Sequence, residues 1–508
     1  MNFCSKNKFT SLLIFFFAFS LFASSQQHKR QMRAVWIATV ENIDWPSDST
    51  MTAQQQKREL LELLDNFKEC NLNTVFFQVR PTADAFYFSN IESWSQYLTG
   101  KAGRAPSPLY DPLQFVIDEA HKRCMEVHVW LNPYRVLNSD DTSLIDPNHL
   151  FFKKPELFVK YGDKYYFNPA HKETREYLNR VVKDLVQRYD IQAVHFDDYF
   201  YPYTVQGETF PDEKEFFLNS RGFEKIEDWR RDNVTTVIKE LRATIKSTKP
   251  WVEFGISPFG VWRNKNRDRR GSDTQAAQTN YDNLYADLLD WIENEYIDYV
   301  VPQIYWHIGR QNADYAIVAE WWNRHVGNVN LYTGLYASGL SVQGGAWRSG
   351  NELIRQIKFN EKFPNITGVA FYSGRPFSKN PQGLRDSLIN NVFKYPALVP
   401  VNKLIKAKND DRIKNLRIQN AGGRLELQWD APTGKGGDAT MFYVLYCFKG
   451  DKIGNTENPK NILVLVANNS VDLRPLTYML EGTYSFAVTS VNRWKHESDA
   501  KSYVTLKF

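Results

Sequence analysis

The chain of 508 residues has a formal net charge of +5, which falls to +3 when Lys6 and Lys8 in the first 25 residues are set aside. Nucleic-acid-binding proteins usually concentrate basic residues on one face, so this balance argues against nucleic acid as the main partner. Three cysteines follow residue 25, namely Cys70, Cys124 and Cys447, and they lack the spacing of a zinc site or a disulfide framework.

The first 25 residues predict a secretory signal peptide. Lys6 and Lys8 form a short basic segment, LLIFFFAFSLF is an apolar core, and ASSQ offers small residues for cleavage near Ser25. Cys4 precedes the apolar core, so it is not the cysteine of a lipoprotein signal. The core is too short for a membrane span, and no second long apolar run follows. We therefore expect a protein that is exported to the periplasm or secreted.

Residues 26–395 alternate short apolar runs with longer amphipathic ones. The predicted strands are 33–40, 74–80, 126–132, 193–197, 253–257, 299–306, 331–336 and 368–373. Helical stretches lie between them, one of which begins with Asp111 as N-cap and Pro112 at its first position. Eight such units predict an α/β fold, a (β/α)8 TIM barrel. The alternative, a doubly wound nucleotide-binding fold, would need a GxGxxG or P-loop motif after a strand, and none occurs.

The pattern changes after residue 395. Residues 396–410 are predicted to be a linker, and residues 411–508 consist of short alternating strands. Trp429 on an early strand and Tyr484 on a late one, followed by SVNRWKHES, resemble the fibronectin type III pattern. That resemblance implies a small all-β sandwich. We expect it to serve in spacing or docking, with an unknown partner.

Polar side chains are predicted to point into the barrel from five strands. Because side chains alternate along a strand, the apolar set faces the helices and leaves the other set inside. That inner set includes Gln78, Arg80, His128, Trp130, Asn132, His195, Asp197, Ser257, Gln303 and Tyr305. A single buried polar residue is usually a satisfied core group. Five strands that each contribute one near the C-terminal end, where barrel enzymes build their sites, predict a polar cavity.

The segment VHFDDYFYP places Asp197 and Asp198 side by side at the end of the fourth predicted strand. A regular strand sends neighbouring side chains in opposite directions, so Asp197 has the inward phase and is the candidate for chemistry. Asp198 is a further catalytic candidate, although we expect it to cap the next segment or orient loop amides unless a bulge turns it inward. The structural alternative for Asp197 is a capping role or an ion pair with Arg80 or His128.

The loops after the strands combine aromatic residues with Asp, Asn and Arg. Aromatic faces stack on sugar rings, and arginine forks bind carboxylates or hydroxyls, so the surroundings favour a glycan. The predicted substrate-binding residues are Trp36, Trp45, Gln78, Arg80, His128, Asn132, Tyr134, Arg135, His195, Tyr199, Trp262, Gln303, Tyr305 and Trp306.

Several motifs in order resemble a known family. RAVWIATVENIDWPS, NTVFFQVRPTADAFY, VHFDDYFYPY, GISPFGVWRN and DYVVPQIYW are similar to the glycosyl-hydrolase-like family 10 of bacterial TIM barrels. The resemblance spans most of residues 31–395, with Cys124 where a glycine is common. It implies exported hydrolysis of cell-wall glycan, as in a divisome-associated member that cuts peptidoglycan strands stripped of their peptides.

The resemblance leaves the second catalytic carboxylate open. VHFD is also similar to the fourth strand of amylase-like barrels, where an aspartate is the nucleophile. Those enzymes carry the acid on the fifth strand, where this chain offers only Ser257. Asp84 and Asp44 are the nearest candidates by loop placement, with Asp273 and Glu320 less favoured. Their separation from Asp197 would decide between retention and inversion of the sugar configuration.

The sequence as a whole predicts an exported glycoside hydrolase that acts on bacterial cell-wall glycan. Two alternatives stay open: a non-catalytic glycan-binding protein built on the same barrel, and a hydrolase of another exogenous polysaccharide. No cofactor and no metal site are predicted. The expected partner is a glycan substrate. We expect neither a nucleic-acid partner nor a membrane span.

Overall fold

The computed structural model describes residues 28–342, 344–348 and 351–508. The predicted signal peptide lies outside these residues. Eight parallel strands close into a barrel in the order β1-β11-β10-β9-β8-β7-β3-β2. They are β1 (Met32–Ile37), β2 (Thr74–Arg80), β3 (Glu126–Leu131), β7 (Ala193–Phe196), β8 (Glu253–Ile256), β9 (Tyr299–Val300), β10 (Asn330–Leu335) and β11 (Ile366–Phe371). The predicted TIM barrel is confirmed.

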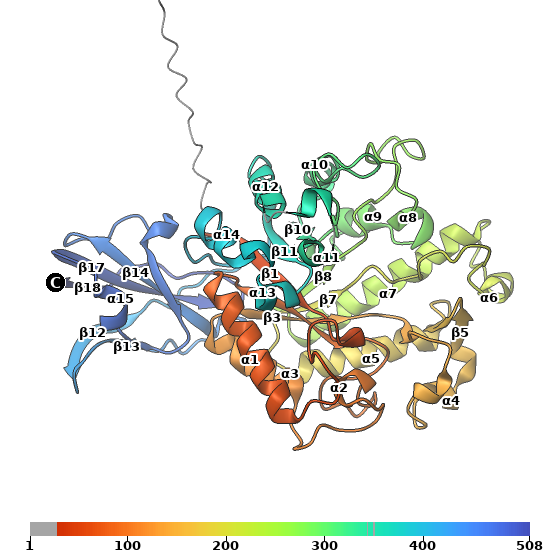
Figure 1. Cartoon of the computed structure of the whole chain (residues 1–508), viewed down its shortest axis with the longest axis horizontal. Helices are drawn as coiled ribbons and strands as arrows, with labels where there is room; N and C mark the ends of the chain where they lie inside the picture. Colours follow the sequence, from red (N-terminus) through yellow and green to blue (C-terminus); the bar gives the residue numbers. More distant parts are fainter. Residues whose placement is uncertain (1–27, 343, 349–350) are drawn as a thin grey trace, which may run out of the picture.

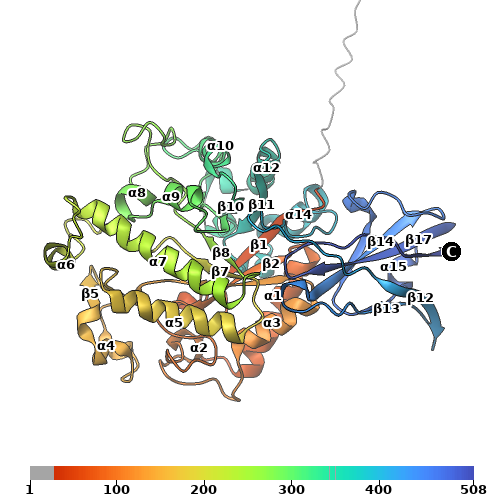
Figure 2. The ribbon, with the colours of Figure 1, turned by 180° about the vertical axis from the view of Figure 1, so that it is seen from behind.

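Helices surround the barrel (Figures 1 and 2). The main helix that follows each barrel strand is, in chain order, α1 (Ala53–Glu69), α3 (Pro112–Lys122), α5 (Lys172–Arg188), α7 (Ile226–Thr248), α9 (Leu288–Glu293), α10 (Tyr315–His325), α12 (Asn351–Asn360) and α14 (Leu384–Asn391). The side chain of Asp111 accepts a hydrogen bond from Gln114 N at the start of α3, with Pro112 in the first turn, as predicted. Leu60, Leu64 and Phe67 of α1 are fully buried against the strands. None of the described helices is long and apolar enough to span a membrane.

One predicted strand is much shorter than expected. We predicted residues 299–306, but β9 contains only Tyr299 and Val300. Pro302 has no backbone N–H and cannot donate to a neighbouring strand, so the ladder is interrupted there. Gln303 then returns to the barrel through isolated bridges to Phe259 and Gly334. The strand therefore still delivers Gln303 to the mouth of the barrel.

Two further units accompany the barrel. After β3, a small antiparallel sheet is formed by β4 (Arg135–Leu137), β6 (Lys164–Phe167) and β5 (Phe158–Tyr161). The C-terminal region is all-β. One of its sheets contains β12 (Lys414–Ala421), β13 (Arg424–Asp430) and β16 (Ser470–Asp472). The other contains β15 (Ile462–Val466), β14 (Thr440–Lys449), β17 (Thr483–Asn492) and β18 (Tyr503–Lys507). Trp429, Tyr443 and Phe486 belong to one buried cluster that joins the two sheets. The fibronectin type III resemblance stays a prediction.

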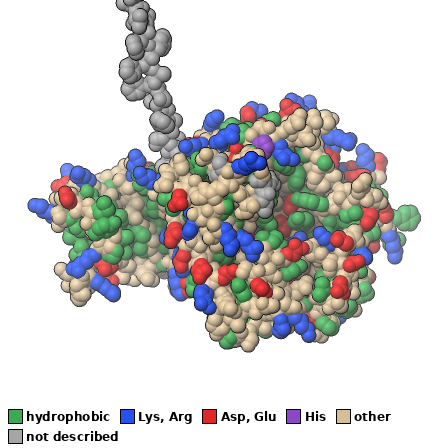
Figure 3. Space-filling model, viewed as in Figure 1, with side chains coloured by type: hydrophobic (Ala, Val, Ile, Leu, Met, Phe, Trp, Pro, Cys, Tyr) green, Lys and Arg blue, Asp and Glu red, His purple; other side chains and the backbone are tan. Residues whose placement is uncertain are grey.

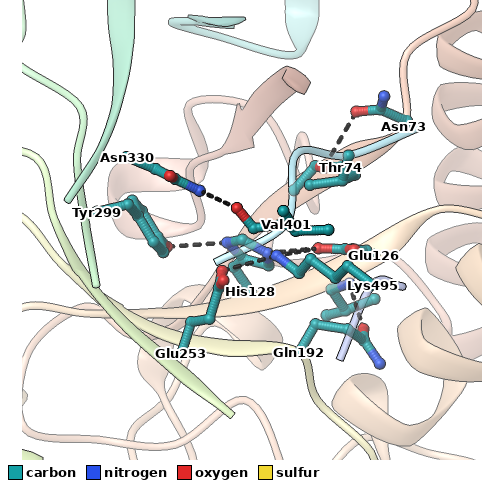
Figure 4. Close-up of polar contacts among 12 residues, drawn as sticks. Asn73, Thr74, Glu126, His128, Gln192, Glu253, Tyr299, Asn330, Val401 and Lys495 are labelled. Carbon is teal, nitrogen blue, oxygen red and sulfur yellow. Dashed lines mark hydrogen bonds and ion pairs between the residues drawn. The ribbon is translucent and has the colours of Figure 1, made fainter. Parts of the chain in front are cut away.

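The C-terminal domain inserts one lysine into the floor of the barrel (Figure 4). Lys495 lies just after β17, and its Nζ is 3.0 Å from Glu126 Oε2 on β3 and 2.7 Å from Glu253 Oε2 on β8. All three side chains are buried. The two carboxylates raise the pKa of Lys495 against the effect of burial, so the lysine stays charged. At the rim of the same interface, Arg493 pairs with Asp190 at 2.6 Å.

A column of hydrogen bonds continues from this triad up the axis of the barrel. His128 Nε2 lies 3.1 Å from Glu126, and His128 Nδ1 lies 2.8 Å from the Tyr299 hydroxyl. The same hydroxyl is 3.1 Å from His195 Nδ1. We call Lys495, Glu126, His128, Tyr299 and His195 the axial column.

One set of protons satisfies the whole column. The Trp36 indole can only donate, and it donates to His195 Nε2 at 3.2 Å, so His195 carries its proton on Nδ1. Nδ1 then donates to Tyr299, whose hydroxyl donates to His128, whose Nε2–H donates to Glu126. Burial lowers the pKa of His128 to about 4 and that of His195 well below its ordinary value. Both imidazoles are therefore neutral at physiological pH.

Replacement of Lys495 by Met tests the role of this triad. Lys495→Met leaves Glu126 and Glu253 buried without their counter-charge, which should cost about 3–5 kcal/mol of unfolding free energy. The triple variant Lys495→Met/Glu126→Gln/Glu253→Gln removes all three charges and should recover most of that loss. Chemical denaturation of the full mature chain measures both. A single variant as stable as the wild type would show that the triad does not hold the domains together.

Candidate active site

A cavity of about 670 Å³ opens at the C-terminal ends of the barrel strands. Its wall consists of Trp36, Val40, Glu41, Ile43, Gln78, Trp130, Arg135, Asn138, Lys164, Tyr166, Asp197, Asp198, Tyr199, Tyr203, Ser257, Gln303, Tyr305, Trp306, Arg310, Tyr336, Trp347 and Tyr372. Aromatic side chains predominate, and carboxylates and cations interrupt them. On the face of the molecule seen in Figure 3, basic and acidic side chains are mixed rather than gathered by sign.

Asp197 and Asp198 both face this cavity, and we call them the carboxylate pair. Asp197 accepts hydrogen bonds from Trp130 Nε1 at 3.0 Å and from Asn132 Nδ2 at 3.2 Å. Asp198 accepts from the Tyr203 hydroxyl and, at 3.1 Å, from Gln303 Nε2. The expectation that Asp198 turns away is therefore corrected. The prediction assumed that side chains alternate as in a regular strand. Because β7 ends at Phe196, this alternation does not extend to Asp197 and Asp198.

Burial raises the pKa of both carboxyl groups. The pKa of Asp197 rises from 3.8 to about 7, with the charge of Asp198 adding to the rise and Arg135 opposing it. The pKa of Asp198 rises to about 6, moderated by its bonds from Tyr203 and Gln303. Two neighbouring carboxyl groups titrate as a unit. The pair therefore holds about one proton near neutral pH, which makes one member an acid and the other a base.

Comparison with known proteins now identifies the family. The sequence pattern of the family described as glycosyl hydrolase-like 10 matches residues 31–344. The chain belongs to this family. It is 39% identical over 506 residues to glycosyl hydrolase YngK of Bacillus subtilis, with 97% of each chain covered. It is 38% identical over 378 residues to glycosyl hydrolase DigH of Escherichia coli, with 69% of this chain and 84% of DigH covered.

These relatives confirm the resemblance found in the sequence, and the chain is a glycoside hydrolase. Among solved structures, the glycoside hydrolase domain of PgaB from Bordetella bronchiseptica is similar to 71% of this chain and 99% of its own length. Its TM-score is 0.48 at 13% identity, which adds nothing about activity.

Half of the predicted site residues line the cavity of this hydrolase. Besides the carboxylate pair, they are Trp36, Gln78, Arg135, Tyr199, Gln303, Tyr305 and Trp306. Arg135 lies with its guanidinium carbon 5.2 Å from the ring centre of Tyr199, next to the pair. Tyr305 stacks between two neighbours, with ring centres 5.4 Å from Tyr336 and 5.5 Å from Tyr372. These three rings form one aromatic stretch of the cavity wall.

Asp44 and Asp84, expected as partners of Asp197, do not reach the cavity wall. Asp44 is buried and accepts from Ala38 N and Ser373 Oγ, both at 2.8 Å, so it ties the end of β1 to the end of β11. Asp84 accepts two bonds from Thr82 within its own loop. Both loops turn back on the barrel and use their carboxylates to hold the backbone. The less favoured candidates Asp273 and Glu320 lie outside the cavity too, Asp273 exposed and Glu320 paired with Arg324 on α10.

Other predicted substrate-binding residues also serve the fold. Arg80 is fully buried, pairs with Glu92 at 2.7 Å and donates to the Asn132 carbonyl, so its guanidinium is occupied. The remainder lie behind the cavity wall: Trp45, Tyr134 and Trp262 in the hydrophobic core, His128 and His195 in the axial column, and Asn132 against Asp197. The polar atoms of a buried cation or imidazole are hydrogen-bonded within the protein, so they are not free to bind a substrate.

Several wall residues were missed, for two reasons. Lys164 and Tyr166 belong to β6, in the sheet inserted after β3. Arg310 lies in a loop and Trp347 in the short 3-10 helix Gly345–Arg348, and the sequence does not indicate the course of either segment. Tyr336 and Tyr372 were within reach, since each lies at the end of a predicted strand. Among the described residues, no group of three or more His, Cys, Asp or Glu is placed to hold a metal ion.

The raised pKa of Asp197 predicts a pH-dependent stability difference. Because the folded state holds this proton up to about pH 7 and the unfolded state only to about 3.8, unfolding free energy falls as pH rises between these values. Asp197→Asn removes that loss. The Tm of the variant minus that of the wild type should therefore grow from pH 4 to pH 8, by about 2 °C or more.

Differential scanning fluorimetry across this pH range measures the difference. Glu320→Gln provides the matched control, because it makes the same carboxyl-to-amide change outside the cavity, on the exposed side of α10. A Tm difference for Asp197→Asn that stays flat would mean that the buried carboxyl group is not strained by its surroundings.

Proposed function

We propose that this glycoside hydrolase cleaves glycosidic bonds in bacterial cell-wall glycan, outside the cytoplasm, on strands that have lost their peptides. The observation that carries the proposal is the carboxylate pair, with one proton near neutral pH, at the bottom of an aromatic-lined cavity. The predicted signal peptide supports export. The sequence similarity to DigH and YngK supports the reaction class.

The pair supplies the acid that glycoside hydrolysis requires. Cleavage needs a proton on the leaving oxygen and a negative charge near the anomeric carbon as positive charge develops there. Asp197 and Asp198 provide one protonated and one ionised carboxyl group at the same place. The stacked rings of Tyr305, Tyr336 and Tyr372 offer apolar faces for the sugars on either side of the bond.

Two cations on the cavity wall favour an anionic glycan. Lys164 and Arg310 line the cavity, and neither side chain has a hydrogen-bond or ion-pair partner among the described residues. Arg135 is a third cation on the same wall. In intact peptidoglycan the lactyl group of the muramic sugar is joined to a peptide through an amide. Removal of the peptide exposes a carboxylate there, which Lys164 or Arg310 can bind.

Reducing-end release tests the proposal. The chain without its predicted signal peptide is incubated with purified peptidoglycan, either intact or stripped of peptides by an amidase. We expect release from stripped glycan, and a loss of roughly 10³-fold in Asp197→Asn, the size found when a group that acts in the transition state is removed. Glu320→Gln should keep the wild-type rate. Arg310→Gln should raise KM for stripped glycan several-fold more than for neutral chitin oligosaccharides.

Each part of the proposal can fail separately. Equal release from intact and stripped glycan would contradict the need for peptide-free strands. Release only from another polysaccharide would contradict the cell-wall assignment. Full activity in Asp197→Asn would remove that residue from the reaction.

A further inference from the structure

We propose that the nucleophile in this reaction is the 2-acetamido group of the substrate itself, served by two adjacent carboxylates. Asp197 holds the amide N–H of the sugar, and Asp198 protonates the leaving oxygen. The inference rests on the proposed function, because it takes the glycan to be a polymer of 2-acetamido sugars.

The first argument is the placement of carboxylates around the cavity. Glycosidases with two separate carboxylates place them on opposite sides of the scissile bond, at about 5–5.5 Å for retention or about 6.5–9.5 Å for inversion. Asp197 and Asp198 are instead consecutive residues on one wall. Residues 1–27, 343 and 349–350 contain no Asp or Glu, so the structure describes every carboxylate side chain among the 508 residues. Only one other, Glu41, lines the cavity.

Glu41 is the rival for the role of nucleophile. It lies in the short turn Val40–Asn42 after β1, three strands away from β7 around the barrel. Its side chain is exposed and accepts a hydrogen bond from Asn138. An exposed carboxylate stays hydrated, whereas both members of the carboxylate pair are buried. The strongly desolvated groups in the cavity are therefore on one side of the substrate.

The second argument is the match between neighbouring carboxylates and neighbouring substituents. In a 2-acetamido sugar the leaving oxygen on C1 and the nitrogen on C2 are vicinal, so two adjacent carboxyl groups can reach both at once. The indole of Trp130 lines the cavity and donates to Asp197. Its ring offers an apolar surface beside Asp197 for the acetamido methyl. Asp198 is held instead by hydrogen bonds from Gln303 and Tyr203.

Substrate binding then determines which of the two aspartates carries the proton. A hydrogen bond from the amide N–H stabilises the ionised form of Asp197. Since the pair holds about one proton near neutral pH, that proton is left on Asp198. The proton donor is therefore created when the acetamido group is in place.

The reaction balances with water as the only other reactant. The acetamido carbonyl oxygen attacks C1 while the bond from C1 to the leaving oxygen breaks, and Asp198 gives its proton to that oxygen. Ionised Asp197 stabilises the positive five-membered ring that forms. Water next attacks C1 and gives a proton to Asp198, and the ring opens to restore the acetamide. Two displacements at C1 retain its configuration.

The test varies the nucleophile within the substrate. Peptide-stripped strands are de-N-acetylated and then re-acylated with acetyl, fluoroacetyl, difluoroacetyl or trifluoroacetyl groups, and kcat/KM is measured for each with the mature chain. Each fluorine weakens the carbonyl oxygen, so kcat/KM should fall stepwise, by about a hundredfold across the series. A flat series would overturn the inference and leave the proposed function intact. No hydrolysis of re-acetylated strands would overturn the proposed function itself.

Variants separate the two aspartates and the rival. On an aryl 2-acetamido glycoside with a good leaving group, Asp198→Asn should recover much of its rate, because that leaving group needs no proton, and Asp197→Asn should not. Glu41→Gln should keep kcat within about tenfold of the wild type. A larger loss in Glu41→Gln, restored by azide with formation of a glycosyl azide, would identify Glu41 as the nucleophile and contradict the inference.

Discussion

The burial of two neighbouring carboxyl groups is the constraint on which the rest of the site depends. Asp197 and Asp198 lie buried at the end of a barrel strand, and neither forms an ion pair with any of the residues that the structure describes. The protein supplies neutral hydrogen-bond donors instead. Trp130 and Asn132 donate to Asp197, and Tyr203 and Gln303 donate to Asp198. Neutral donors stabilise the charge only partly. The remaining cost appears as raised pKa values, which keep a proton available near neutral pH.

The axial column beneath the site explains how that balance is kept. If His195 or His128 were protonated, a positive charge below the cavity would lower the pKa of the carboxylate pair. Burial and a complete set of hydrogen bonds keep both imidazoles neutral. Within the axial column the formal charges lie only at the floor of the barrel, where Lys495 neutralises Glu126 and Glu253. The C-terminal domain therefore completes the barrel in addition to any docking role.

The sequence was sufficient for the barrel because its signal is repeated eight times. It was sufficient for the cavity where a residue lay within a strand or within a few residues of the end of one. Trp36 and Gln78 lie within strands, and Tyr199 and Gln303 lie a few residues beyond β7 and β9. The prediction that Asp198 turns away from the cavity was wrong because β7 ends at Phe196, directly before the pair. Arg80 was misassigned because its partner, Glu92, lies in a loop that the pattern does not place. Lys164 was missed because it reaches the cavity from an inserted sheet.

The difficulty of placing loop residues from sequence also explains why Asp44 and Asp84 were wrongly predicted as partners of Asp197. Loop position suggested Asp44 and Asp84, since each follows a barrel strand, but both use their oxygens on nearby backbone and hydroxyl groups. Whether a loop carboxylate faces the substrate or the backbone depends on side-chain hydrogen bonds that short sequence patterns do not encode. The carboxylate that lines the cavity beside Asp197 is Asp198, its immediate neighbour in the sequence.

The anomeric configuration of the first product tests the central claim most directly. The new reducing end can be observed by proton NMR in the first minutes of hydrolysis, before the anomers equilibrate. A reaction that runs through the carboxylate pair and the acetamido group predicts that the configuration of the cleaved bond is retained. Inversion would require a water molecule activated by a carboxylate on the opposite face, and would contradict this account.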